Sequence, residues 1–129
     1  MGKILIVEDN PKNSKLMVDL LTVHGHETMV AEDGPVGLEM AEAEQPDLIL
    51  MDVQLPGMDG YEVTKRLKAM ESTKSIPIII VTSFAMKGEE RRAEEVGASA
   101  YIAKPIDIHH VIATVARFLP MERKHKSEE

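Results

Sequence analysis

Five side chains that can bind cations or phosphoryl groups each follow a short apolar run of the chain: Glu8, Asp9, Asp52, Thr82 and Lys104. Two carboxylates about 4 Å apart repel by roughly 4 kcal/mol at an effective dielectric constant near 20. If the three carboxylates converge, they therefore need a cation or protons, and Lys104 supplies one positive charge. A few carboxylate oxygens suit Mg²⁺, which keeps several of its waters. The set predicts a magnesium site beside a carboxylate nucleophile, with Thr82 and Lys104 placed to bind phosphoryl oxygens.

These side chains stand at the ends of expected β-strands. Three runs are almost wholly apolar and branched, which is typical of strands buried on both faces of a parallel sheet, and two weaker runs suit strands nearer its edge. The five expected strands cover residues 4–7, 28–31, 48–51, 78–81 and 100–103. Ligands of open α/β sheets bind beyond the carboxyl ends of the strands, so we expect the five side chains to share one edge.

Helical patterns with recognisable ends lie between the strands. Four of the five expected helices begin after a capping side chain, namely Asn10, Asp33, Asp59 and Asp107. The first has the apolar stripe Leu16, Met17, Leu20 and Leu21, and the last has the clearest stripe, Ile108, Val111, Ile112, Val115, Phe118 and Leu119. The remaining helix, residues 86–96, has a thin apolar face of Ala93 and Val96. Alternation of strand and helix predicts the α/β class, a doubly wound five-stranded parallel sheet with five helices.

Composition narrows the class of protein further. The chain has 129 residues, which is enough for one domain and too short for two ordinary ones. A net charge of −7 without a basic cluster argues against direct nucleic-acid binding, and the absence of cysteine excludes thiol chemistry. With no signal peptide and no run long enough to span a membrane, we expect a cytoplasmic protein. Residues 1–120 are expected to form the domain and residues 121–129 a flexible charged tail.

The motifs, taken in order, resemble the receiver domain of two-component response regulators over roughly residues 3–119. They are Ile6-Val7-Glu8-Asp9-Asn10, Pro46-Asp47-Leu48-Ile49-Leu50-Met51-Asp52, Leu55-Pro56-Gly57-Met58-Asp59-Gly60, Val81-Thr82-Ser83-Phe84-Ala85-Met86-Lys87-Gly88 and Lys104-Pro105. The stretch 84–88 is most similar to stand-alone receivers of the DivK type and to receivers attached to hybrid histidine kinases. The resemblance implies a flavodoxin-like receiver fold with strand order 2-1-3-4-5.

The resemblance also implies roles at the acidic site. Asp52 would accept a phosphoryl group from a histidine kinase or a histidine phosphotransfer protein. Asp9 would bind Mg²⁺ directly, Glu8 would act largely through water, and the backbone carbonyl of Gln54 would complete the protein's share of the ligands. We further expect Gln54 and Phe84 to slow self-dephosphorylation, because such positions govern the access of water.

A second group of implied roles concerns the switch. Thr82 would move to bond the phosphoryl oxygen, Lys104 would bridge to the same group, and Tyr101 would turn inward as Thr82 moves. The bond before Pro105 is expected to be cis. A downstream protein would bind to the face formed by the fourth helix, the fifth strand and the fifth helix, so the chain would act as a switch and not as a turnover enzyme.

Several alternatives remain open at this point. A phosphohydrolase of the haloacid dehalogenase type would want a second Asp two residues after the nucleophile, where this chain has Gln54. A nucleotide or flavin carrier would want a Gly-, Ser- or Thr-rich loop in place of Glu8-Asp9-Asn10-Pro11. Both are disfavoured. Within the receiver class, the chain could be an end-point regulator, a phosphorelay intermediate that passes the group to a phosphotransfer histidine, or the receiver portion of a hybrid kinase.

Overall fold

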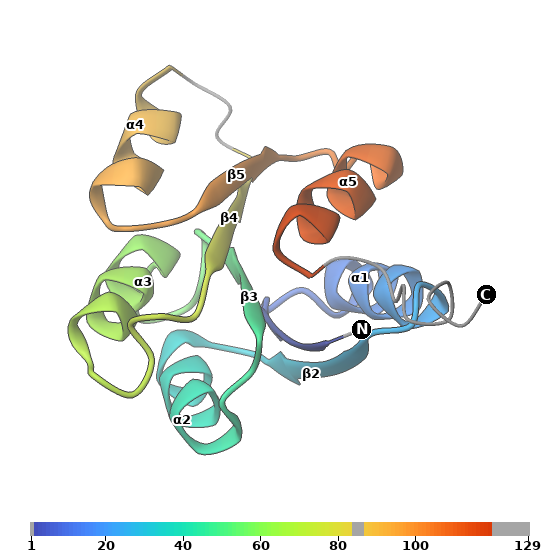
Figure 1. Cartoon of the computed structure of the whole chain (residues 1–129). Helices are drawn as coiled ribbons and strands as arrows, with labels where there is room; N and C mark the ends of the chain where they lie inside the picture. The colour runs from blue at the N-terminus through green and yellow to red at the C-terminus, as the bar shows by residue number, and fades with distance from the viewer. Residues whose placement is uncertain (1, 84–86, 120–129) are drawn as a thin grey trace.

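Five parallel strands form one sheet in the order β2-β1-β3-β4-β5, as expected from the sequence (Figure 1). The structure, a computed structural model, describes residues 2–83 and 87–119. The strands are β1 (Lys3–Val7), β2 (Glu27–Ala31), β3 (Leu48–Asp52), β4 (Ile78–Thr82) and β5 (Ala100–Ala103). Because β1 and β3 are neighbours at the centre, the loops after them open side by side at the carboxyl edge.

Helices cover both faces of the sheet, with α1 and α5 on one face and α2, α3 and α4 on the other (Figure 1). They are α1 (Pro11–Val23), α2 (Gly34–Glu44), α3 (Gly60–Ala69), α4 (Lys87–Glu95) and α5 (Ile108–Phe118). The four expected caps form, since each capping side chain accepts hydrogen bonds from the first turn of its helix. The longest described helix, α1, has 13 residues, and none in residues 2–83 and 87–119 could cross a bilayer.

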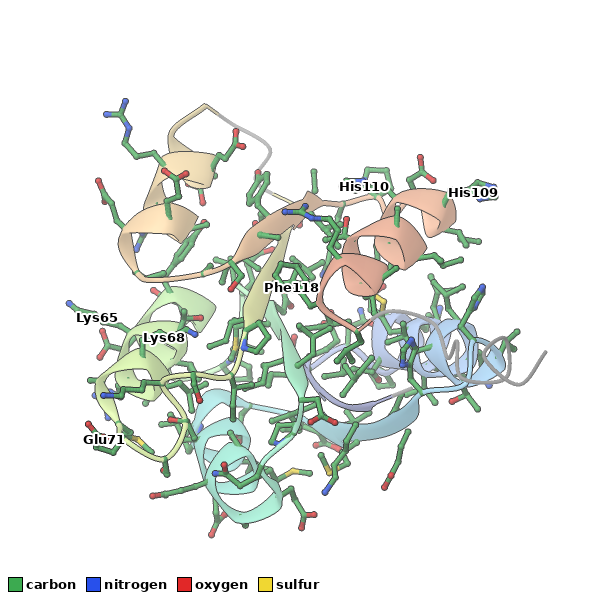
Figure 2. All side chains as sticks on the ribbon, viewed as in Figure 1. Lys65, Lys68, Glu71, His109, His110 and Phe118 are labelled. Atoms are coloured by element: carbon green, nitrogen blue, oxygen red, sulfur yellow. The ribbon has the colours of Figure 1, made fainter. Side chains whose placement is uncertain are left out.

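The core is divided by the sheet into two apolar layers. Alternate residues of the central strands face opposite ways, so that Ile4 and Leu50 pack toward α1 and α5 while Leu5 and Met51 pack toward α2, α3 and α4. Side chains fill both spaces, as Figure 2 shows, with Phe118 packed against the α1 and α5 layer. This burial of β1, β3 and β4 on both faces explains their continuous apolar runs.

Two residues of the expected helical stripes prove to be exposed, which corrects the sequence prediction. Leu16 on α1 is 43% exposed, and Ile108 at the start of α5 is 46% exposed. In α1 the buried side chains are Met17 and Leu21, one turn apart, and Leu16 lies about 100° around the helix from Met17. Ile108 precedes the first buried residue of α5, Val111, by nearly a full turn.

Some sequence predictions fall outside the described residues. These are the start of the fourth helix at Met86, the shielding role of Phe84, the end of the domain at residue 120, and the tail over residues 121–129. The described part of α4 agrees with a thin apolar face, because Ala93 is buried and Val96 is partly buried.

Candidate functional site

Three carboxylates meet at the carboxyl edge of β1 and β3. Val7 and Met51 are register partners, so the residues that follow them, Glu8 and Asp52, emerge side by side. Glu8 is 7% exposed and Asp52 is 5% exposed, whereas Asp9 faces solvent. One carboxylate oxygen from each of the three lies within 4.8 Å of the others. Sequence reasoning placed all three at this edge, and the structure brings them together.

Lys104 reaches this cluster from the end of β5. Its Nζ lies 3.2 Å from Glu8 Oε1 and 3.4 Å from Asp52 Oδ1, and the side chain is largely buried. The backbone N–H of Lys104 donates to the carbonyl of Thr82 at 2.7 Å, and this hydrogen bond fixes the backbone from which the lysine side chain extends. The Lys104–Pro105 peptide bond is cis. One ammonium is therefore shared between two nearly buried carboxylates.

The surroundings of Asp52 shift the pKa of its carboxyl group. Burial, and next the negative charge of Glu8, raise the pKa of Asp52 to about 6, while Lys104 and the backbone N–H of Gln54 act in the opposite direction. At neutral pH the ionised Asp52 therefore sits in a pocket with an excess of negative charge. Such a pocket favours a second cation in addition to the ammonium of Lys104.

The donor set fits a hard divalent cation. Carboxylate oxygens from Glu8, Asp9 and Asp52 are the ligands that Mg²⁺ takes in proteins, and solvent-facing Asp9 leaves room for bound waters. Gln54 lies beside the cluster, because its backbone N–H donates to Asp52 Oδ1 at 3.4 Å and its side-chain Oε1 accepts from Ser83 Oγ at 3.3 Å. The residues that are present could hold a metal ion here.

Thr82 stands at the same edge of the sheet. It ends β4, which pairs with β3 so that Val81 is the partner of Asp52, and its side chain is fully buried. The hydroxyl-bearing residue predicted to meet the phosphoryl group therefore follows the direct neighbour of the carboxylate predicted to accept it.

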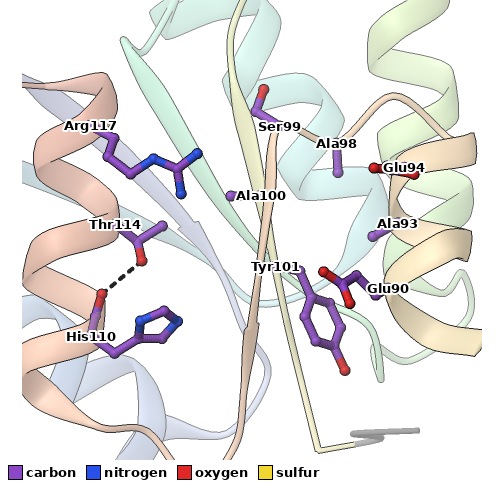
Figure 3. Close-up of a pocket in the computed structure, with 10 residues that line it drawn as sticks. All are labelled: Glu90, Ala93, Glu94, Ala98, Ser99, Ala100, Tyr101, His110, Thr114 and Arg117. Carbon is purple, nitrogen blue, oxygen red and sulfur yellow. Dashed lines mark hydrogen bonds between the residues drawn. The ribbon is translucent and has the colours of Figure 1, made fainter. Parts of the chain in front are cut away.

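Tyr101 lies apart from the acidic cluster, on β5 and between α4 and α5. Burial, and then the charges of Glu89 and Glu90, raise its pKa. It lines a pocket of about 230 Å³. Figure 3 shows Glu90 beside its ring. The α5 wall of this pocket carries His110 and Arg117 and the α4 wall is acidic, so the expected partner face is a hollow with opposite charges on its two sides.

Gly60 has a positioning role that the sequence did not predict, although the residue ends the motif at residues 55–60. A Cβ on Gly60 would lie 2.0 Å from the backbone oxygen of Asp52, so no side chain fits between the start of α3 and the end of β3. The N–H of Gly60 donates to Val53 O at 2.8 Å and ties the helix to the strand. The sequence feature that could have indicated this role is the glycine directly after the capping residue Asp59, at a helix position where residues with a higher helix propensity are usual.

The comparisons with known proteins agree with this geometry. Residues 4–116 match the family described as the response regulator receiver domain. The polar-differentiation response regulator DivK of Brucella ovis is 48% identical over 116 residues, which make up 90% of this chain and 94% of that protein.

Solved structures give the same result. The receiver domain of a sensor histidine kinase from Pseudomonas aeruginosa, which has a magnesium ion coordinated in its active-site cleft, has a TM-score of 0.84 at 33% identity and covers 92% of this chain and 97% of that chain. The chemotaxis protein CheY4 of Vibrio cholerae has a TM-score of 0.86 at 28% identity, covering 92% of this chain and 98% of that chain.

Proposed function

The chain belongs to the response regulator receiver domain family, and from this premise we propose that Asp52 is its phosphoacceptor, with a phosphohistidine on a histidine kinase or phosphotransfer protein as the donor. The observation that carries the proposal is the setting of Asp52. Its carboxylate ends the central strand β3, nearly buried, with Glu8 on one side and the Lys104 ammonium 3.4 Å away. The cytoplasmic location expected from the sequence is part of the same proposal.

The residues provide for an in-line transfer. A carboxylate oxygen of Asp52 attacks the phosphorus atom, the P–N bond to the donor imidazole breaks, and the imidazole leaves with the electron pair and takes up a proton. Asp52 must be deprotonated to attack, and Lys104 favours that form. The product is an acyl phosphate on Asp52, whose oxygens the Lys104 ammonium stabilises.

Mg²⁺ is the proposed cofactor, held by Asp9 and Asp52 directly, by Glu8 largely through water, and by the carbonyl of Gln54. When bound, it would supply positive charge to the phosphoryl oxygens and to the carboxylates. The magnesium ion reported in the receiver domain from Pseudomonas aeruginosa supports this assignment.

Signalling follows from the acyl phosphate. In this proposal Thr82 moves to bond a phosphoryl oxygen, Tyr101 turns inward, and the face of α4, β5 and α5 changes its affinity for a downstream protein. The pocket of about 230 Å³ on that face gives a partner a place to bind (Figure 3). The relatives named as response regulators support the assignment of a response regulator. Passage of the phosphoryl group to a phosphotransfer histidine is the alternative. The chain assists its own phosphorylation and dephosphorylation and is not proposed to be a turnover enzyme.

The test is phosphorylation of the full chain by a small phosphodonor. We expect intact-mass spectrometry to show the addition of one phosphoryl group after incubation with acetyl phosphate and Mg²⁺, and no addition in the presence of a chelator. Asp52→Asn should take up none, whereas Asp19→Asn, which alters an exposed ion pair with Lys15, should behave like the wild type. A mass increase that persists in Asp52→Asn would overturn the assignment.

A further inference from the structure

Helices α3 and α4 are joined by a polar contact outside the acidic cluster. The hydroxyl of Tyr61, in the first turn of α3, donates to Glu89 Oε1 at 2.5 Å and lies 3.4 Å from the backbone oxygen of Glu89. The guanidinium carbon of Arg92 lies 4.3 Å from the centre of the Tyr61 ring. Tyr61 is only 2% exposed and Glu89 is half-buried, so this contact is partly shielded from water.

Helix α4 has little else to hold it against the domain. Of its side chains that the structure describes, Ala93 is the buried apolar one, whereas α3 buries Tyr61, Val63 and Leu67. The other described side chains of α4 are charged. With only Ala93 and the partly buried Val96, directly after the helix, as apolar contacts, the position of α4 depends strongly on its polar contacts.

The contact borders the phosphoacceptor loop. A groove of about 350 Å³ runs between α3 and α4, and Tyr61, Glu89 and Arg92 form one side of it. The same groove is also lined by Val53, Gln54 and Leu55, the three residues that follow Asp52. A displacement of α4 would therefore change the lining of a groove that also contains the loop directly after the acceptor.

The sequence links the same helix to the residue proposed to respond to the phosphoryl group. Helix α4 starts at Lys87, five positions after Thr82. A hydrogen bond weakens steeply with distance and angle, so a displacement of α4 by more than about 1 Å would break the bond between Tyr61 and Glu89. Burial, and then the hydrogen bond to Glu89, raise the pKa of Tyr61, so the hydroxyl remains a donor at neutral pH.

We propose that Tyr61 is a positioning residue for α4: its hydrogen bond to Glu89, with Arg92 stacked on its ring, is a latch that holds α4 in the unphosphorylated position. The proposal rests on the function proposed for Asp52. Coupling between two sites is reciprocal, so a contact that opposes the displacement of α4 also weakens binding of the phosphoryl group at Asp52. Loss of the latch should make the activated state easier to reach.

The experiment titrates the full chain with beryllium fluoride and Mg²⁺, a phosphoryl mimic, and follows amide exchange in α4 by NMR. Tyr61→Phe keeps the ring under Arg92 and removes only the hydroxyl. In Tyr61→Phe we expect faster amide exchange in α4. The concentration of beryllium fluoride that half-saturates the protein should be about tenfold lower than for the wild type, which equals about 1.4 kcal/mol. In a Glu89→Ala background the Tyr61→Phe change should have no further effect.

The control is Thr73→Val, which removes another buried hydroxyl bond, to Leu67 O at 2.7 Å, in the loop after α3. A half-saturating concentration that is unchanged in Tyr61→Phe, or that falls equally in Thr73→Val, would overturn the latch. Additive effects of Tyr61→Phe and Glu89→Ala would overturn it as well. Saturation of Asp52→Asn would instead overturn the function proposed for Asp52, so the two failures are distinguishable.

Discussion

Replacing Asp52 by Asn should make the metal-free protein more stable at neutral pH. The variant has nearly the same shape, and its amide oxygen can still accept from the backbone N–H of Gln54. What it removes is a carboxylate that burial and the charge of Glu8 make costly to ionise in the folded chain. A residue proposed to be central to function is thereby expected to lower the free energy of unfolding.

The magnitude of this stability gain follows from the raised pKa of Asp52. Its pKa is raised from 3.8 to about 6, which is roughly two units at about 1.4 kcal/mol each, or about 3 kcal/mol. The folded chain holds the proton more tightly than the unfolded chain does. The contribution of Asp52 to stability is therefore fully present below about pH 4 and is lost as the pH rises through about 6. The gain in Asp52→Asn should be largest above pH 7 and should shrink toward zero near pH 4.

Urea unfolding in the presence of a chelator, followed by circular dichroism at pH 7.5 and at pH 4.5, measures this difference. Asp19→Asn is the matched control, because its ion pair with Lys15 is exposed and should contribute less than about 1 kcal/mol. Addition of Mg²⁺ should stabilise the wild type more than Asp52→Asn. Equal or lower stability of Asp52→Asn at pH 7.5 would refute the reasoning, as would a gain that does not depend on pH.

Three further predictions concern the surroundings of Asp52. Lys104→Met should lower the free energy of unfolding by about 3 kcal/mol at pH 7.5, because it leaves two nearly buried carboxylates without their ammonium. Urea unfolding measures this loss, and a loss below about 0.5 kcal/mol, roughly the error between variants, would contradict the prediction. Gly60→Ala should lower the free energy of unfolding by about 3 kcal/mol in the same assay, because a Cβ there would meet the backbone of Asp52. Gly88→Ala, whose Cβ meets open space in α4, should raise the free energy of unfolding by about 0.5 kcal/mol. Equal effects of the two substitutions would contradict the close approach at Gly60. Asp9→Asn should weaken Mg²⁺ binding at least about tenfold in calorimetric titration, and unchanged affinity would argue against Asp9 as a ligand.

The helices and strands could be predicted from the sequence because short stretches of consecutive residues indicate where each one begins or is buried. Asn10 and Asp107 cap helices through hydrogen bonds to residues two and three positions later, which makes a helix start visible in a few consecutive residues. The buried strands were visible for a similar reason, because a strand covered on both faces must be apolar throughout. The strand order came from the family resemblance and is confirmed by the structure.

The exposed residues Leu16 and Ile108 show what the sequence pattern could not predict. Both are apolar and stand in positions compatible with an amphipathic stripe, yet a helix buries only the part of its stripe that meets the sheet. How far each helix is rotated depends on all of its neighbours. That rotation is a property of the packed domain and is not encoded in the periodicity of one segment.

The sequence by itself determined the α/β class, the five helices and strands, and the gathering of Glu8, Asp52 and Lys104 at one edge, because parallel strands must end on the same side of their sheet. Only the tertiary structure decided the depth at which Asp52 is buried, the sharing of Lys104 between two carboxylates, and the contact of Tyr61 with Glu89 across 28 positions of the chain. These features depend on distances of a few ångströms between segments far apart in sequence, and such distances are set by the packing of the whole domain.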